Sequence, residues 1–116
     1  MLVSPHRYWL SLAIALALST SISAAQTVHL LGFVDKLCAD QPNCFELMVK
    51  PEFVAEVGAS IKVRFNAATR IYDPENYELT LEQQNIVPGS HLRMLIEADV
   101  NGGPGEYQAS FIWIGD

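Results

Sequence analysis

The chain has 116 residues, of which 50% are hydrophobic and 17% are charged, and its formal net charge is −6. This length allows one domain with a core of modest size. The acidic balance argues against nucleic acid and anionic lipid as partners, because both are bound mainly through clustered Lys and Arg.

The first 25 residues have the pattern of a secretory signal peptide. Arg7 precedes an apolar run from Trp9 to Leu18, and small residues lead up to Ala25. The apolar run is about half of the ~20 residues that a membrane-spanning helix needs. We therefore expect cleavage near Ala25. Residues 26–116 would then form a single domain in the periplasm or outside the cell, with no stable membrane insertion and, without Arg7, a net charge of −7.

The only two cysteines, Cys38 and Cys44, flank the polar stretch "ADQPN". Two cysteines in an exported chain usually pair, because the compartment is oxidising. A redox pair is more often C-x-x-C ahead of a helix, whereas here C-x₅-C precedes a strand pattern. The sequence therefore predicts a structural disulfide at the base of a hairpin.

The remaining chain shows a hydrophobic period of two almost everywhere, which is typical of half-buried strands. The last of these segments looks apolar on both faces, with its residues Tyr107, Ala109, Phe111 and Trp113 in one phase. The five predicted strands have the sequences "TVHLLGFVDK", "FELMVK", "SIKVRFNA", "HLRMLIEAD" and "YQASFIWI".

The connections differ in character. "PEFVAEVGA" (51–59) reads as a wide loop and "NGGPG" (101–105) as a flexible hairpin tip. The period breaks between Asp73 and Ser90, where Thr80 and Gln83 form a capping-box pattern. We therefore expect one short helical segment between the third and fourth strands.

Five strands in this order, with a bent first strand, predict an all-β fold: a five-stranded OB-type barrel. Barrel closure would remove exposed sheet edges. An open β-sandwich fragment is the alternative. The pattern "HLLGFVDKL", "FELMVK", "IKVRFNAATRIYD", "LTLEQQNIVPGSHLRMLIEAD" and "YQASFIWI" also resembles the small, mostly uncharacterised OB-fold proteins that bacteria export.

Candidate binding residues follow from the second and third strands, which form the usual ligand surface of OB folds. We expect this face, rather than the glycine-rich tip, to bind a protein or glycan partner of the cell envelope. A plain solvated surface is the alternative. The candidate residues are Met48, Lys62, Arg64, Arg70 and Tyr72.

His29 and His91 stand at the starts of the first and fourth strands, which are neighbours in such a barrel. Together with Met48 or Met94 they would suit copper, so a small metal-binding or stress-related protein is the alternative function. No metal-ligand spacing supports it, and we expect no cofactor.

Catalytic patterns are absent from the sequence: there is no G-x-S-x-G and no H-E-x-x-H. Glu97 and Asp99 share a strand face, but paired carboxylates need a sugar-sized cleft for glycoside hydrolysis. We therefore expect a binding protein that is not an enzyme.

Overall fold

The structure is a computed structural model that describes residues 26–115. The predicted signal peptide lies outside the described residues. Within the described part of the chain, no helix has the length and apolarity needed to cross a bilayer. The elements, in chain order, are β1 (Thr27–Leu37), β2 (Cys44–Val49), the 3-10 helix η1 (Pro51–Phe53), α2 (Val54–Val57), β3 (Ser60–Arg64), β4 (Arg70–Tyr72), β5 (Glu78–Leu79), β6 (His91–Ala98) and β7 (Glu106–Ile114).

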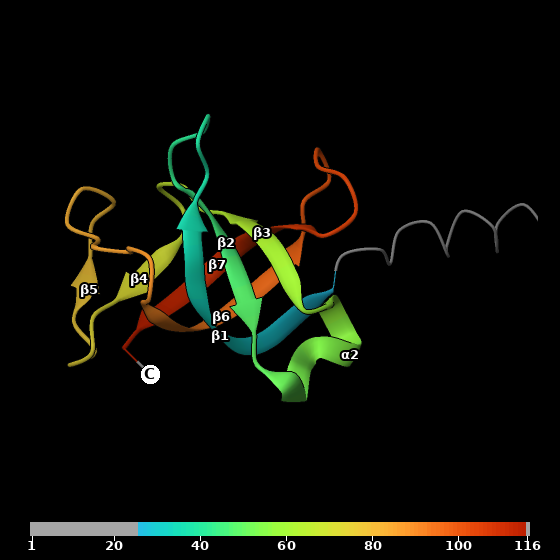
Figure 1. The fold of residues 1–116 in the computed structure, drawn as a ribbon. Coiled ribbons are helices and arrows are strands. Elements are labelled where there is room, and N and C mark those ends of the chain that lie inside the picture. Colours follow the sequence, from blue (N-terminus) through green and yellow to red (C-terminus); the bar gives the residue numbers. More distant parts are fainter. Residues whose placement is uncertain (1–25, 116) are drawn as a thin grey trace, which may run out of the picture.

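The strands form one sheet in the order β3-β2-β1-β6-β7-β4-β5, and β3 also pairs with β7 (Figure 1). This extra parallel pairing closes β1, β2, β3, β7 and β6 into a five-stranded OB-type barrel. The predicted fold is confirmed and the open sandwich is excluded. The five predicted strands are the five barrel strands, while β4 and β5 extend the sheet beyond the barrel.

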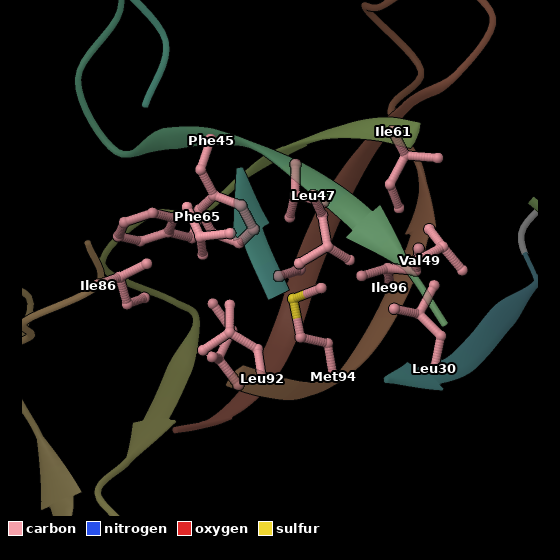
Figure 2. Close-up of a cluster of buried hydrophobic side chains, with 14 of the residues drawn as sticks. Leu30, Phe45, Leu47, Val49, Ile61, Phe65, Ile86, Leu92, Met94 and Ile96 are labelled. Atoms are coloured by element: carbon pink, nitrogen blue, oxygen red, sulfur yellow. The ribbon is translucent and has the colours of Figure 1, made fainter. Parts of the chain in front are cut away.

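The core is the apolar side of these strands (Figure 2). Leu30, Phe45, Leu47, Leu92 and Met94 are each fully buried. The period of two places every second side chain inside, so most inward residues follow the sequence pattern.

β1 lies between β2 and β6 in the barrel. It pairs with β2 along one edge and with β6 along the other. Gly32 lies where β1 approaches β2 closely. A Cβ at this position would stand 2.5 Å from the carbonyl oxygen of Met48 and 2.8 Å from Leu47 Cδ2. Glycine is required here because of this close approach and not because of its backbone freedom.

The short helix lies one connection earlier than expected. η1 and α2 occupy residues 51–57, between β2 and β3, where we expected a loop. Pro51 begins the segment and Gly58 ends it with φ 99°. Both signals are typical of helix ends, and Phe53, Val54 and Val57 pack against the core.

Between β3 and β6, the third and fourth barrel strands, the predicted capping box forms. The segment that it begins is a single turn and not a helix. Thr80 Oγ1 accepts the Gln83 backbone N–H at 3.3 Å, and Gln83 Oε1 accepts the Thr80 backbone N–H at 2.9 Å. The chain then continues without regular secondary structure to Ile86, whose side chain is buried beside Phe65 (Figure 2). Ile86 closes this end of the barrel, so no helix is needed there.

The alternation in β7 changes phase, which contradicts the pattern expected from the sequence. A register shift opposite Leu95 and Ile96 adds one residue to β7, and a bulge of this kind turns the following side chains to the other face. Ala109 and Ile112 are therefore buried. Phe111 and Trp113 lie on the outside of the barrel.

Candidate functional site

Met48, Lys62 and Arg64 lie on the outer face of β2 and β3, each partly exposed. In the register of these strands Glu46 is opposite Lys62, Met48 is opposite Ser60, and Cys44 is opposite Arg64. The three candidate residues of these strands therefore share one face, as the alternation predicts.

Arg64 is the most connected side chain on this face. Its Nη1 lies 2.9 Å from Asp99 Oδ2 and 2.7 Å from Glu106 Oε1. Its Nε donates to Gln41 Oε1 at 3.0 Å. The hydrogen bond from Arg64 holds the pKa of Glu106 below its ordinary value, with a smaller contribution from the Gly103 backbone. The pKa of Arg64 is raised, first by its hydrogen bond with Glu106.

Two loops meet at this guanidinium. The disulfide loop between β1 and β2 supplies Gln41, and the glycine-rich loop between β6 and β7 begins after Asp99 and ends at Glu106. Both project from the same end of the barrel (Figure 1). These are the two loops that flank the ligand face in OB folds. The Lys62 backbone N–H also donates to Gly105 O. The glycine-rich loop and the β3 face therefore form one continuous surface.

The disulfide closes the first loop as predicted. Cys38 and Cys44 are bonded, with their Cα atoms 5.3 Å apart, and the Cys38 backbone N–H donates to Cys44 O. The pair stands at the base of the hairpin between β1 and β2. The described part of the chain contains no free cysteine.

Arg70 and Tyr72 do not belong to the β2–β3 face. The chain leaves the barrel after β3, and these residues lie on β4, which pairs in parallel with β7. Arg70 forms an ion pair with Glu78 of β5 at 3.1 Å. The five candidate residues are therefore divided between two surfaces.

Tyr72 is part of a group of planar side chains that we call the aromatic–arginine cluster: Arg70, Tyr72, Arg93, Phe111 and Trp113. Trp113 is its centre. The Trp113 ring is 6.0 Å from the Tyr72 ring and 5.6 Å from the Phe111 ring, both nearly parallel to it. Arg93 Cζ lies 4.6 Å from the Trp113 ring centroid, and Arg70 Cζ lies 6.0 Å from that of Tyr72.

Strand register creates this cluster. Tyr72 and Arg93 are the direct neighbours of Trp113 on β4 and β6, and Arg70 is the neighbour of Phe111. Side chains in such positions on one face of a sheet are in contact. Arg70 is exposed and the other four are partly exposed. Arg93, Phe111 and Trp113 were not predicted from the sequence. The apolar character of both faces of the last strand was a signal for Phe111 and Trp113, and Arg93 on β6 had none.

A hollow of about 280 Å³ borders the cluster. Trp113 and Arg93 form part of its wall, and the turn after β4 supplies Asp73, Pro74 and Asn76. Ile114 and Gly115 at the end of β7 complete the lining. A larger hollow of about 550 Å³ lies beside β5, between residues 67–69 and 78–82.

The two histidines are not brought together. β1 and β6 are neighbours as expected, but His29 pairs with Leu95, whereas His91 pairs with Phe33. This offset of four residues corresponds to roughly 13 Å along the strands. Met94 is buried inside the barrel, away from both rings. Among residues 26–115 no group of three His, Cys, Asp or Glu side chains could hold a metal ion.

The Asp99 carboxylate makes structural contacts through both of its oxygens. Besides its contact with Arg64, its Oδ1 accepts the Asn101 backbone N–H at 3.0 Å. Both carboxylate oxygens of Asp99, which the sequence paired with Glu97 on one strand face, are therefore engaged in contacts within the protein.

The fold and its surfaces define a small disulfide-bonded barrel of the OB type with an aromatic patch on its outer side. Comparison of the chain with protein-family models, with curated proteins and with solved structures finds no match.

Proposed function

We propose that the protein is a non-catalytic binding module of the cell envelope, which contacts a protein or glycan partner after export and cleavage near Ala25. One observation carries the proposal: the aromatic–arginine cluster lies on the outer face of the sheet, where each of its five side chains keeps part of its surface exposed. Tyr, Trp, Phe and Arg are the side chains enriched at the centres of interfaces.

The cluster is prepared for binding because its rings are already held in place. Trp113 is in contact with Tyr72 and Phe111, so little side-chain entropy is left to lose when a partner covers them. Covering the exposed part of these aromatic side chains contributes about 25 cal/mol per Å². A partner gains this free energy without rearrangement of the barrel.

The β2–β3 face is the second surface available to a partner. Arg64 is engaged with Asp99 and Glu106, so Met48 and Lys62 are the members left to make contacts. This face is better explained as a sheet stabilised by cross-strand pairs. Nucleic acid is disfavoured at both surfaces, because the chain has an excess of acidic residues.

A comparative pull-down from envelope extract tests the proposal. Four baits are compared. They are the unchanged protein, the Trp113→Ala variant, the Met48→Ser/Lys62→Glu variant and, as a control, the Phe33→Ala variant. Phe33 is 41% exposed on β1, outside the cluster. We expect Trp113→Ala to lose capture while the other two retain it, with thermal melts confirming that all four are folded. Capture that is equal for all four, or lost only with Met48→Ser/Lys62→Glu, would show that the cluster is not the binding surface.

Export is tested separately, by the intact mass of the protein recovered from the envelope fraction. The expected mass is that of residues 26–116 with the disulfide formed. A full-length product in the cytosol would contradict the location that we propose.

A further inference from the structure

We propose that the hollow beside Trp113 is a subsite for one sugar residue of a neutral glycan. This inference rests on the proposed binding function and names the class of partner. The seven residues that line the hollow are Asp73, Pro74, Asn76, Arg93, Trp113, Ile114 and Gly115.

Two chain segments are shaped to form the hollow. The turn after β4 is fixed by Asp73, whose Oδ1 accepts the backbone N–H groups of Glu75 and Tyr77, both at 2.9 Å. Asn76 adopts φ 70° in this turn, a conformation that Asn tolerates better than most residues.

The end of β7 supplies the opposite side. Gly115 has φ 88°, and its backbone N–H donates to His91 O at 2.7 Å. A Cβ at Gly115 would lie 2.8 Å from Pro74 Cγ, so only glycine lets the two segments approach this closely. The hollow is therefore built by the backbone and exists before any ligand arrives.

The lining chemistry suits a polyhydroxylated neutral ligand. Asp73 and Arg93 contribute opposite charges, so the described residues that line the hollow carry no net charge. The Asp73 carboxylate and the Asn76 amide offer both acceptors and donors, as hydroxyl groups require. Trp113 adds apolar surface to the lining, against which the C–H groups of a sugar ring can pack.

The size and position of the hollow agree with this class of ligand. About 280 Å³ is near the lower limit of small-molecule pockets and leaves room for one pyranose ring rather than for an oligosaccharide. The hollow opens beside the aromatic–arginine cluster, so the following sugar units of a longer glycan could continue over Tyr72 and Phe111.

Intrinsic fluorescence tests the inference, because the chain has two tryptophans, Trp9 and Trp113. In the full chain with Trp9→Phe, the emission reports on Trp113 alone. Titration would use glucose, galactose, N-acetylglucosamine and their β-linked disaccharides, compared with glucuronic acid and glucosamine. A single sugar contact of this size predicts a dissociation constant of about 1 mM.

The decisive variant is Asn76→Gly, which removes the amide and keeps a backbone that can adopt φ 70°. Its matched control is Asn43→Gly at the other positive-φ asparagine, φ 53°, which lies in the disulfide loop. Loss of a hydrogen bond to the sugar predicts about a tenfold weaker affinity for Asn76→Gly and no change for Asn43→Gly.

A saturable response to neutral sugars with this pattern supports the subsite. An unchanged affinity in Asn76→Gly, stronger binding of the charged sugars, or no response to any sugar of the panel would overturn it. These failures are distinguishable from failure of the binding function: if Trp113→Ala still abolishes envelope capture, the function stands and only the neutral-glycan subsite is wrong.

Discussion

Nη1 of Arg64 on β3 lies 2.7 Å from Oε1 of Glu106, the first residue of β7. β3 and β7 form the seam that closes the barrel, and their register contains only three residue pairs, Lys62 with Glu106, Val63 with Tyr107, and Arg64 with Gln108. The ion pair therefore reinforces a short, parallel junction. Both side chains are about one quarter exposed, so water screens the pair only in part.

Arg64→Gln is expected to destabilise the barrel, whereas Lys62→Gln is not. The first change leaves Asp99 and Glu106 without the cation between them and weakens the closing seam. Lys62 is partly exposed on the same strand and, among residues 26–115, takes part in no ion pair. Thermal melts of both variants at neutral pH would measure this, and a drop in the midpoint for Arg64→Gln that does not exceed that for Lys62→Gln would contradict it.

The same contact predicts an acid-dependent loss of stability. The pKa of Glu106 is held below its ordinary value of 4.5 by its hydrogen bond with Arg64. The stabilisation is therefore complete above pH 4.5 and is lost as the pH falls through the lowered pKa of the folded state. Glu106→Gln should be less stable than the parent at neutral pH, and the difference should shrink on acidification. Urea unfolding between pH 7 and pH 2.5 would show this. A constant difference would mean that the carboxylate charge has no role.

The fold could be predicted from the sequence because each barrel strand carries its own signal. Alternation placed Phe45, Leu47 and Val63 in the core without any knowledge of their neighbours, and these residues are fully buried. The exceptions arise where tertiary contacts prevail over a local pattern. Ile86 is buried in the core from the connection where a short helical segment was expected, and a bulge in β7 reverses the phase that alternation predicts.

The candidate site was harder to predict for the same reason. A sequence shows which residues share a strand face, but not which strands are adjacent or in what register. Tyr72 was recognised as a continuation of the third strand, yet it faces Trp113 across the β4–β7 pairing. For His29 and His91 the sequence correctly indicated adjacent strands. The strand register nevertheless separates the two side chains.

Removing the disulfide with Cys38→Ser/Cys44→Ser should lower the free energy of unfolding by roughly 2 kcal/mol, because the bond restricts a seven-residue loop in the unfolded chain. For a domain of this size that is a fall in the melting midpoint on the order of 10 °C. The native protein should show no reactive thiol under denaturing, non-reducing conditions. Two labelled thiols in protein isolated from an oxidising compartment, or an unchanged melt in the double variant, would contradict this role.

Gly32→Ala should be among the most destabilising single substitutions in the chain. The added methyl group would stand 2.5 Å from Met48 O and 2.8 Å from Leu47 Cδ2. The nearer of these atoms belongs to the backbone of β2, which cannot move without disturbing the pairing of β1 with β2. Overpacking of this kind costs roughly 1–3 kcal/mol, and a backbone clash in the middle of a barrel lies at the upper end of that range.

Gly103→Ala is the matched control, because it adds the same methyl group in a loop. The nearest atom to a Cβ at that position is Glu106 Oε2 at 3.5 Å, an ordinary contact. Because alanine also restricts the unfolded chain, this variant should be neutral or slightly stabilising. Urea denaturation of both variants compares the two sites directly. Similar midpoints for Gly32→Ala and Gly103→Ala would show that β1 and β2 can separate at Gly32, and that the close approach is not what fixes glycine there.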